Sequence, residues 1–144
     1  MKTERTADIF VIDDGAIDNV ISKLLINKFD AELSVITLEN PKGALDELFY
    51  ISRNSPSKLP DYIFLDIRMP EMDAWEFLRE FERMGIYKLK NIHIIILSSS
   101  LDHEDFRKSK LNPLVEDHVI KPLDLQKIRN ILGNNRYKIQ NYLN

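Results

Sequence analysis

The stretch "FVIDDG" at residues 10–15 decides the fold, because an apolar run stops there at two adjacent carboxylates, Asp13 and Asp14. From residue 8 onward the run is rich in β-branched and aromatic side chains, which are typical of a buried strand. Two like charges at the edge of an apolar core repel each other and lose hydration. A divalent cation would turn that repulsion into affinity, so the pair indicates a cation site at a strand end.

Four more short apolar runs follow along the chain, and longer amphipathic segments separate them. Helix starts are indicated by Asn40 before Pro41, by Asp73 at the capping-box spacing from Glu76, and by Asp124. Near-continuous apolar strands that alternate with helices predict a parallel sheet covered on both faces. The predicted fold class is α/β, a doubly wound five-stranded parallel sheet with five helices, and the strands are expected at 8–14, 33–38, 62–67, 92–97 and 115–120.

The helix expected after the first strand carries one apolar stripe, which is how a helix covers a sheet. The helix after Asp73 is expected to run to about Met84, where Gly85 can adopt the left-handed conformation that ends a helix. The stripe of the first helix consists of Ile17, Val20, Ile21, Leu24, Leu25 and Phe29.

The composition limits the class of protein. The chain has 144 residues, of which 44% are hydrophobic and 30% are charged, as in an ordinary globular domain. We expect a single domain over residues 1–144, with its core at about 8–132 and a C-terminal extension at 133–144. The lack of cysteine excludes disulfides and thiolate metal sites. A formal net charge of −3 gives no electrostatic basis for direct nucleic-acid binding.

The start of the chain, "MKTERTAD", is polar and lacks the apolar core of a secretion signal. The apolar runs are too short to span a bilayer, so no membrane insertion is expected. We therefore expect a cytoplasmic protein.

Acidic, hydroxyl and amine side chains stand where the expected strands end. The carboxyl ends of parallel strands meet at one rim of an open sheet, and ligands bind there. Oxygen ligands with open coordination positions suit Mg²⁺. The side chains expected to meet at this rim are Asp13, Asp14, Asp66, Ser98 and Lys121.

This set of groups is suited to phosphoryl transfer to a carboxylate. Mg²⁺ would neutralise phosphoryl oxygens, which Lys121 and Ser98 would hold. Asp66 is the best nucleophile candidate, because its strand is central and its partners come from both sides. Plainer roles are also open: the acidic pair after the first strand could cap a helix, and Ser98 could form a turn while Ser99 supplies the hydroxyl.

Four strings in fixed order carry a resemblance to a known family: "VIDD", "IFLDIRMPEMD", "IIILSS" and "VIKP". Over about residues 8–132 the chain resembles the receiver domain of two-component response regulators. The resemblance implies a flavodoxin-like fold with receiver topology. It also implies that the chain takes a phosphoryl group from a partner histidine kinase or histidine phosphotransfer protein, with Mg²⁺ as cofactor. No enzymatic turnover is implied beyond phosphorylation and dephosphorylation of the chain itself.

The resemblance assigns roles residue by residue. Asp66 would be phosphorylated, with Ser98 and Lys121 as its catalytic partners. The peptide before Pro122 would be cis, as is usual in this family. The protein ligands of Mg²⁺ would be Asp13, Asp14, Asp66 and the main-chain carbonyl of Arg68.

The chain departs from the family pattern at some positions. Ala74 replaces a usual glycine, which would strain the loop if that position needs a positive φ. His118 replaces the aromatic switch residue that works with Ser98, and it could act as a switch or be a static strand residue. The resemblance also implies that Arg68 and Ser100 occupy positions at which members of the family tune the lifetime of the phosphoryl group.

The resemblance also predicts a signalling face and a downstream target protein. The face would combine 102–111, the strand around His118, and the polar side of 125–132. No output domain is expected after these segments, so the chain is interpreted as a single-domain regulator.

The sequence also bears on three other functions. A haloacid dehalogenase-type phosphatase needs a second acid where Arg68 stands. A flavodoxin-like cofactor binder needs a glycine-rich phosphate loop, and the chain has only four glycines. A degenerate receiver that binds partners without phosphorylation remains the alternative.

Overall fold

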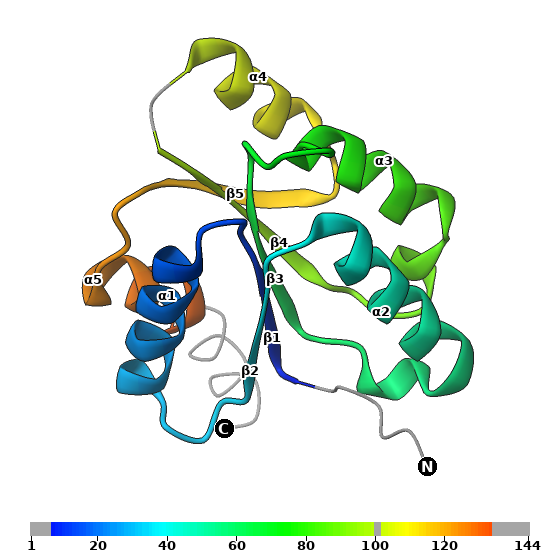
Figure 1. The fold of residues 1–144 in the computed structure, drawn as a ribbon, viewed down its shortest axis with the longest axis horizontal. Helices are drawn as coiled ribbons and strands as arrows, with labels where there is room; N and C mark the ends of the chain where they lie inside the picture. The colour runs from blue at the N-terminus through cyan, green and yellow to red at the C-terminus, as the bar shows by residue number, and fades with distance from the viewer. Residues whose placement is uncertain (1–6, 100–101, 134–144) are drawn as a thin grey trace, which may run out of the picture.

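The computed structural model of the protein describes residues 7–99 and 102–133, and these form a parallel five-stranded sheet in the order β2-β1-β3-β4-β5 (Figure 1). The strands lie within one or two residues of the predicted runs, and the predicted α/β fold is confirmed. Their bounds are β1 (Ile9–Ile12), β2 (Val35–Leu38), β3 (Tyr62–Asp66), β4 (His93–Ser98) and β5 (Val115–Ile120).

Helices follow the strands in alternation, and their predicted caps are present. The Asn40 side chain accepts hydrogen bonds from two main-chain N–H groups, and the Asp73 and Asp124 side chains each accept one. Gly85 has a φ of 73°, as its role after the third helix requires. The helices are α1 (Ala16–Phe29), α2 (Pro41–Asn54), α3 (Ala74–Arg83), α4 (His103–Leu111) and α5 (Leu125–Ile128), which continues as a π turn over Arg129–Gly133.

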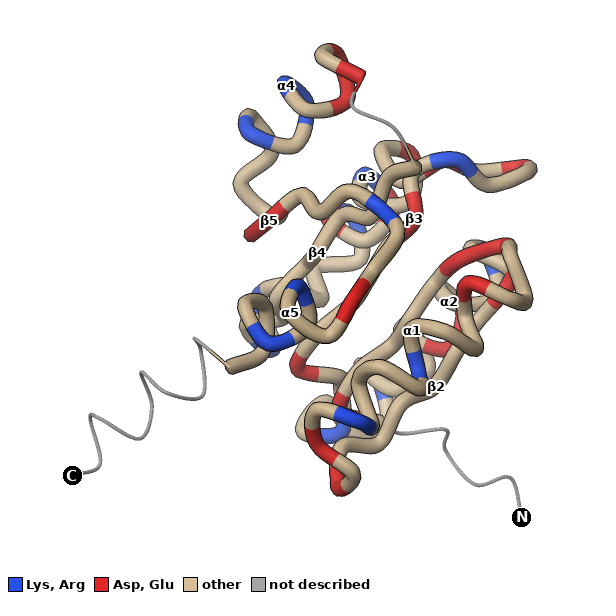
Figure 2. Tube along the Cα trace, turned by 90° about the vertical axis from the view of Figure 1, so that its left-hand side faces the viewer, with Lys and Arg blue, Asp and Glu red and all other residues tan. Residues whose placement is uncertain are grey.

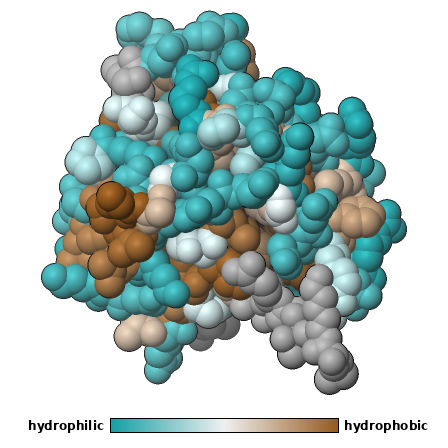
Figure 3. Space-filling view, viewed as in Figure 1, coloured by the Kyte–Doolittle hydropathy of each residue, from teal (hydrophilic) through white to brown (hydrophobic). Residues whose placement is uncertain are grey.

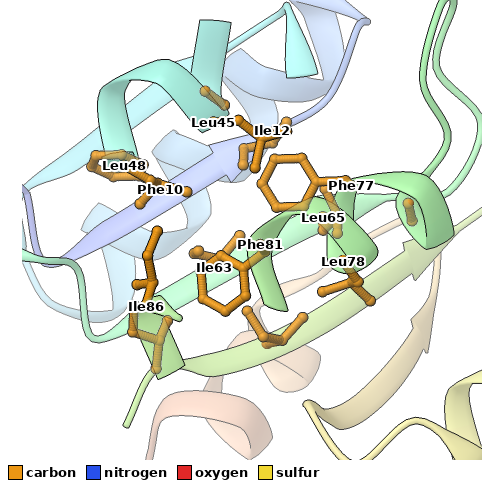
Figure 4. Close-up of a cluster of buried hydrophobic side chains, with 14 of the residues drawn as sticks. Phe10, Ile12, Leu45, Leu48, Ile63, Leu65, Phe77, Leu78, Phe81 and Ile86 are labelled. Atoms are coloured by element: carbon orange, nitrogen blue, oxygen red, sulfur yellow. The ribbon is translucent and has the colours of Figure 1, made fainter. Parts of the chain in front are cut away.

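The sheet is buried on both faces, which is why its strands are apolar throughout. Phe10 and Ile12 of β1 point into a cluster under α2 and α3, where Phe77 and Phe81 are almost completely buried (Figure 4). The alternate residue Val11 points into a second cluster with residues of α5. Because successive side chains of a strand point to opposite faces of the sheet, each apolar strand contributes to both hydrophobic clusters.

The apolar stripe of α1 does not face the core, and the prediction that it covers the sheet is wrong for four of its six members. Ile17, Val20, Ile21 and Leu24 are 44–76% exposed and form a hydrophobic patch over α1 (Figure 3). The reason lies at the start of the helix, where the buried Asn19 Nδ2 donates to the Asp13 carbonyl oxygen over 2.8 Å. This bond turns the face of Asn19, Ser22 and Ile26 toward the sheet.

The loop between β3 and α3 accommodates the unusual alanine. Ala74 is the first residue of α3 and is fully buried, and the non-glycine residue with positive φ in the described chain is Glu71, at 70°. Alanine therefore causes no strain at position 74. The Lys121–Pro122 peptide is cis. No helix among residues 7–99 and 102–133 is both long and apolar enough to cross a membrane.

Candidate functional site

Three aspartates meet at the carboxyl ends of the central strands. Asp13 and Asp14 follow β1, and Asp66 is the last residue of β3. One carboxylate oxygen from each lies within 4.8 Å of the others. Asp13 and Asp66 are buried while Asp14 is exposed, so the cluster opens to solvent on one side.

Lys121 connects this cluster to the end of β5. Its Nζ lies 2.6 Å from Asp13 Oδ2 and 3.2 Å from both Asp66 Oδ1 and Asp18 Oδ2. The ammonium therefore compensates part of the negative charge. Asp18, in the first turn of α1, was not expected from the sequence, because its contact with Lys121 joins residues 103 positions apart.

The ionisation of the site follows from this geometry. Burial raises the pKa of Asp66 to about 6, and the Asp13 charge adds to the shift while Lys121 opposes it. For Lys121, burial disfavours the charged form, but hydrogen bonds and the charges of Asp13 and Asp66 outweigh burial and raise its pKa. The ionised Asp66 carboxylate is thus a costly charge, which a bound cation would stabilise.

The pKa of Asp66 predicts how stability depends on pH in metal-free protein. Because the folded-state pKa lies above the ordinary value of 3.8, folding favours the protonated carboxyl, and ionisation destabilises the fold as pH rises from about 4 to 6. Asp66→Asn should therefore raise the free energy of unfolding by about 2 kcal/mol at pH 7.5, and by little at pH 4. Urea titrations at both pH values in a metal chelator measure this difference. An equal gain at the two pH values would contradict the assignment.

Ser98 completes the rim at the end of β4. Ser98 is buried, and its Oγ shares a hydrogen bond of 2.7 Å with His118 Nε2. Its neighbour Ser99 is exposed, which does not favour the alternative hydroxyl. The His118 Nδ1 shares a second bond of 2.7 Å with Ser109 Oγ on α4. Burial lowers the pKa of His118, against the opposing charges of Asp105 and Asp117, so the imidazole is favoured in its neutral form.

Arg68 takes a different direction from the other site residues. Its guanidinium reaches α4, where Nη2 lies 2.5 Å from Asp105 Oδ2 and 3.9 Å from Asp102 Oδ2. Sequence reasoning missed Asp105 and Ser109, which are the buried members of an otherwise polar helix. Ser100, expected to tune the lifetime of the phosphoryl group, lies outside the described residues, as does the extension after residue 133.

The donor set fits Mg²⁺. It consists of carboxylate oxygens, which are hard ligands, and an exposed side leaves room for water and for a phosphoryl oxygen. The raised pKa of Asp66, caused first by burial and then by the Asp13 charge, shows that Lys121 compensates this carboxylate only in part.

A family model and solved structures match the chain. The family model of the response regulator receiver domain matches residues 9–133. A two-component response regulator from Cytophaga hutchinsonii superposes with a TM-score of 0.79 at 25% identity, covering 90% of this chain and 97% of that one.

Curated relatives are longer proteins. The chain is 30% identical over 92 residues to a probable methanogenesis regulatory protein, FilR2, of Methanothrix harundinacea, covering 64% of this chain and 57% of that protein. It is 30% identical over 114 residues to the sensor histidine kinase CheAY of Helicobacter pylori, covering 79% of this chain and 13% of the kinase. The chain thus spans little more than half of one relative and a small part of the other. With most of its length matched to the family model and its fold shared with a solved regulator, the chain belongs to the response regulator receiver domain family.

Proposed function

We propose that the chain is a phosphoryl-accepting response regulator, with Asp66 as the acceptor and a histidine kinase or histidine phosphotransfer protein as the donor. The observation that carries this proposal is the cluster of Asp13, Asp14 and Asp66 with Lys121 bridging two of its members. Transfer rather than multiple turnover is proposed, so the chain is not an enzyme in the usual sense. A cytoplasmic location without direct nucleic-acid binding is part of the proposal.

The chemistry requires one bond to break and one to form. An Asp66 carboxylate oxygen attacks phosphorus, the P–N bond to the donor imidazole breaks, and the nitrogen keeps the electron pair. Lys121 and the Ser98 hydroxyl stabilise the transferred oxygens. Bound Mg²⁺ would supply positive charge against the phosphoryl oxygens, held by the aspartate cluster and the main-chain carbonyl of Arg68. Water later hydrolyses the acyl phosphate, which returns Asp66 to a carboxylate.

The proposal is tested by incubating the protein with acetyl phosphate and Mg²⁺, followed by intact-mass measurement. We expect one added phosphoryl group, dependent on Mg²⁺ and released by hydroxylamine, which cleaves acyl phosphates. A protein that remains unlabelled under these conditions, and with a panel of phosphorylated kinases, would instead be a degenerate receiver.

The proposed output is a change of the signalling face formed by α4, β5 and α5, read by a downstream target protein. A phosphoryl group adds nearly two negative charges beside Ser98, so its hydroxyl is expected to leave His118 and turn toward the phosphoryl oxygens. His118, which bonds Ser109 and whose ring centroid lies 5.7 Å from that of Phe106 in the resting structure, then loses its Ser98 partner and repacks.

Replacing His118 tests this coupling. In His118→Ala, beryllofluoride with Mg²⁺ should still bind, but the chemical-shift changes on α4 and β5 should fall to less than about half of those in the wild type. Nuclear magnetic resonance of labelled protein measures both. His93→Ala is the matched control, since His93 lies at the opposite end of the neighbouring strand, paired with Glu116. Full-size changes in His118→Ala would show that the histidine is a static strand residue.

A further inference from the structure

The α4 helix is attached to the molecule by polar contacts. It lies beyond the edge strand β5, at one corner of the molecule (Figures 1 and 2). Its two buried residues are Asp105 and Ser109, whereas Phe106 and Leu111 are 40% and 69% exposed. Apolar burial therefore contributes little to its position, and the hydrogen bonds of two side chains decide where it sits.

Asp105 is the centre of these bonds. Asp105 is only 5% exposed. One oxygen of its carboxylate accepts a hydrogen bond from Trp75 Nε1 of α3 over 3.1 Å, and the other accepts one from Arg68 Nη2 over 2.5 Å. The Arg68 side chain is 65% exposed, so a buried carboxylate is compensated by a cation that reaches in from the surface.

A chain of hydrogen bonds continues from Asp105 to the site hydroxyl. Ser109 Oγ donates to the Asp105 carbonyl oxygen over 3.1 Å and also bonds His118, which bonds Ser98. One end of this chain is Arg68, two residues after the acceptor Asp66. The other end is Ser98, at the end of the neighbouring strand. Both ends therefore belong to residues at the rim of the sheet that carries Asp66.

We infer that Asp105 is a positioning residue that holds Arg68 and α4 in the unphosphorylated arrangement, so that phosphorylation of Asp66 has to break or rearrange its contacts. The inference rests on the proposed function. A phosphoryl group attracts both the guanidinium and the Ser98 hydroxyl, and thus competes with Asp105 for the first and with His118 for the second. A contact that forms only in the unphosphorylated arrangement weakens the binding of any ligand that stabilises the phosphorylated arrangement.

Neutralising Asp105 should therefore strengthen the response to a phosphoryl mimic. Asp105→Asn keeps an oxygen for the indole N–H of Trp75 and removes the charge that holds Arg68. We expect it to bind beryllofluoride, at saturating Mg²⁺, about five- to tenfold more tightly than the wild type. The indole resonance of Trp75, the single tryptophan of the chain, reports the titration directly.

Asp102→Asn is the matched control. Asp102 also faces Arg68, but at 3.9 Å and half exposed, and asparagine retains its role as the cap of α4. Its affinity for beryllofluoride should stay within about twofold of the wild type. In an Arg68→Gln background, Asp105→Asn should no longer change the affinity, because the contact is already lost.

The outcomes separate the two proposals. If the wild-type protein does not bind beryllofluoride, the proposed function fails, and the inference fails with it. If the wild type binds and Asp105→Asn binds equally or more weakly, Asp105 is merely structural, and only the inference is overturned. Should Asp105→Asn not fold, Arg68→Gln removes the same contact from an exposed position. Its ligand-free indole resonance must then shift toward the bound position of the wild type, and an unmoved resonance overturns the inference.

Discussion

Asp66→Asn should reduce incorporation of a phosphoryl group from acetyl phosphate to the background level, while the protein remains folded. The carboxamide occupies the same space, but its oxygen is not an anionic nucleophile. Because metal-free Asp66 is a destabilising charge, the substitution removes the reaction without harming the fold. Intact-mass spectrometry with Mg²⁺ measures the loss, and thermal unfolding checks the structure.

Asp73→Asn is the control for this loss. Asp73 belongs to the same loop and caps α3 by accepting from the Glu76 N–H over 2.9 Å, a role that asparagine fills equally well. It should be labelled as fast as the wild type. Hydroxylamine-sensitive label that persists on Asp66→Asn would mean that another carboxylate is the acceptor.

Lys121→Met should destabilise metal-free protein by about 2–4 kcal/mol, because it leaves two buried carboxylates without their cation. The expected fall in the melting temperature is about 10 °C for a domain of this size. Mg²⁺ should restore part of the loss, since the cation binds the same carboxylates in the folded state alone. Calorimetry with chelator and with excess Mg²⁺ measures both effects.

The matched control is Lys88→Met, which removes an exposed lysine whose ammonium lies over the Tyr87 ring at 5.9 Å. It should change stability by less than about 0.5 kcal/mol, with no dependence on Mg²⁺. A Lys121→Met protein as stable as the wild type in chelator would show that the ion pairs seen here contribute nothing net.

The hydrophobic pattern of the sequence predicted the strands correctly but not the orientation of α1. The strands could be placed from sequence because burial on both faces leaves a short, continuous apolar run, and β-branched residues and flanking turn residues distinguish it from a helix. The prediction that the apolar stripe of α1 faces the sheet was wrong, because a hydrophobic period of 3.6 residues identifies a helix but does not fix which side of it faces the core. The bond from Asn19 to the Asp13 carbonyl oxygen sets the orientation, and amide hydrogen bonding has no periodic signature.

The sequence by itself determined the fold class and the rim where Asp13, Asp14, Asp66, Ser98 and Lys121 meet. It did so because parallel strands joined by right-handed crossovers place all their carboxyl ends at one edge. Only the tertiary structure decided which groups touch there. Lys121 meets Asp18 across 103 positions of sequence, and Arg68 meets Asp105 across 37. Such pairs depend on how each helix is rotated about its axis and on which charged side chains become buried and therefore need a partner. Neither property can be read from a short segment of the sequence.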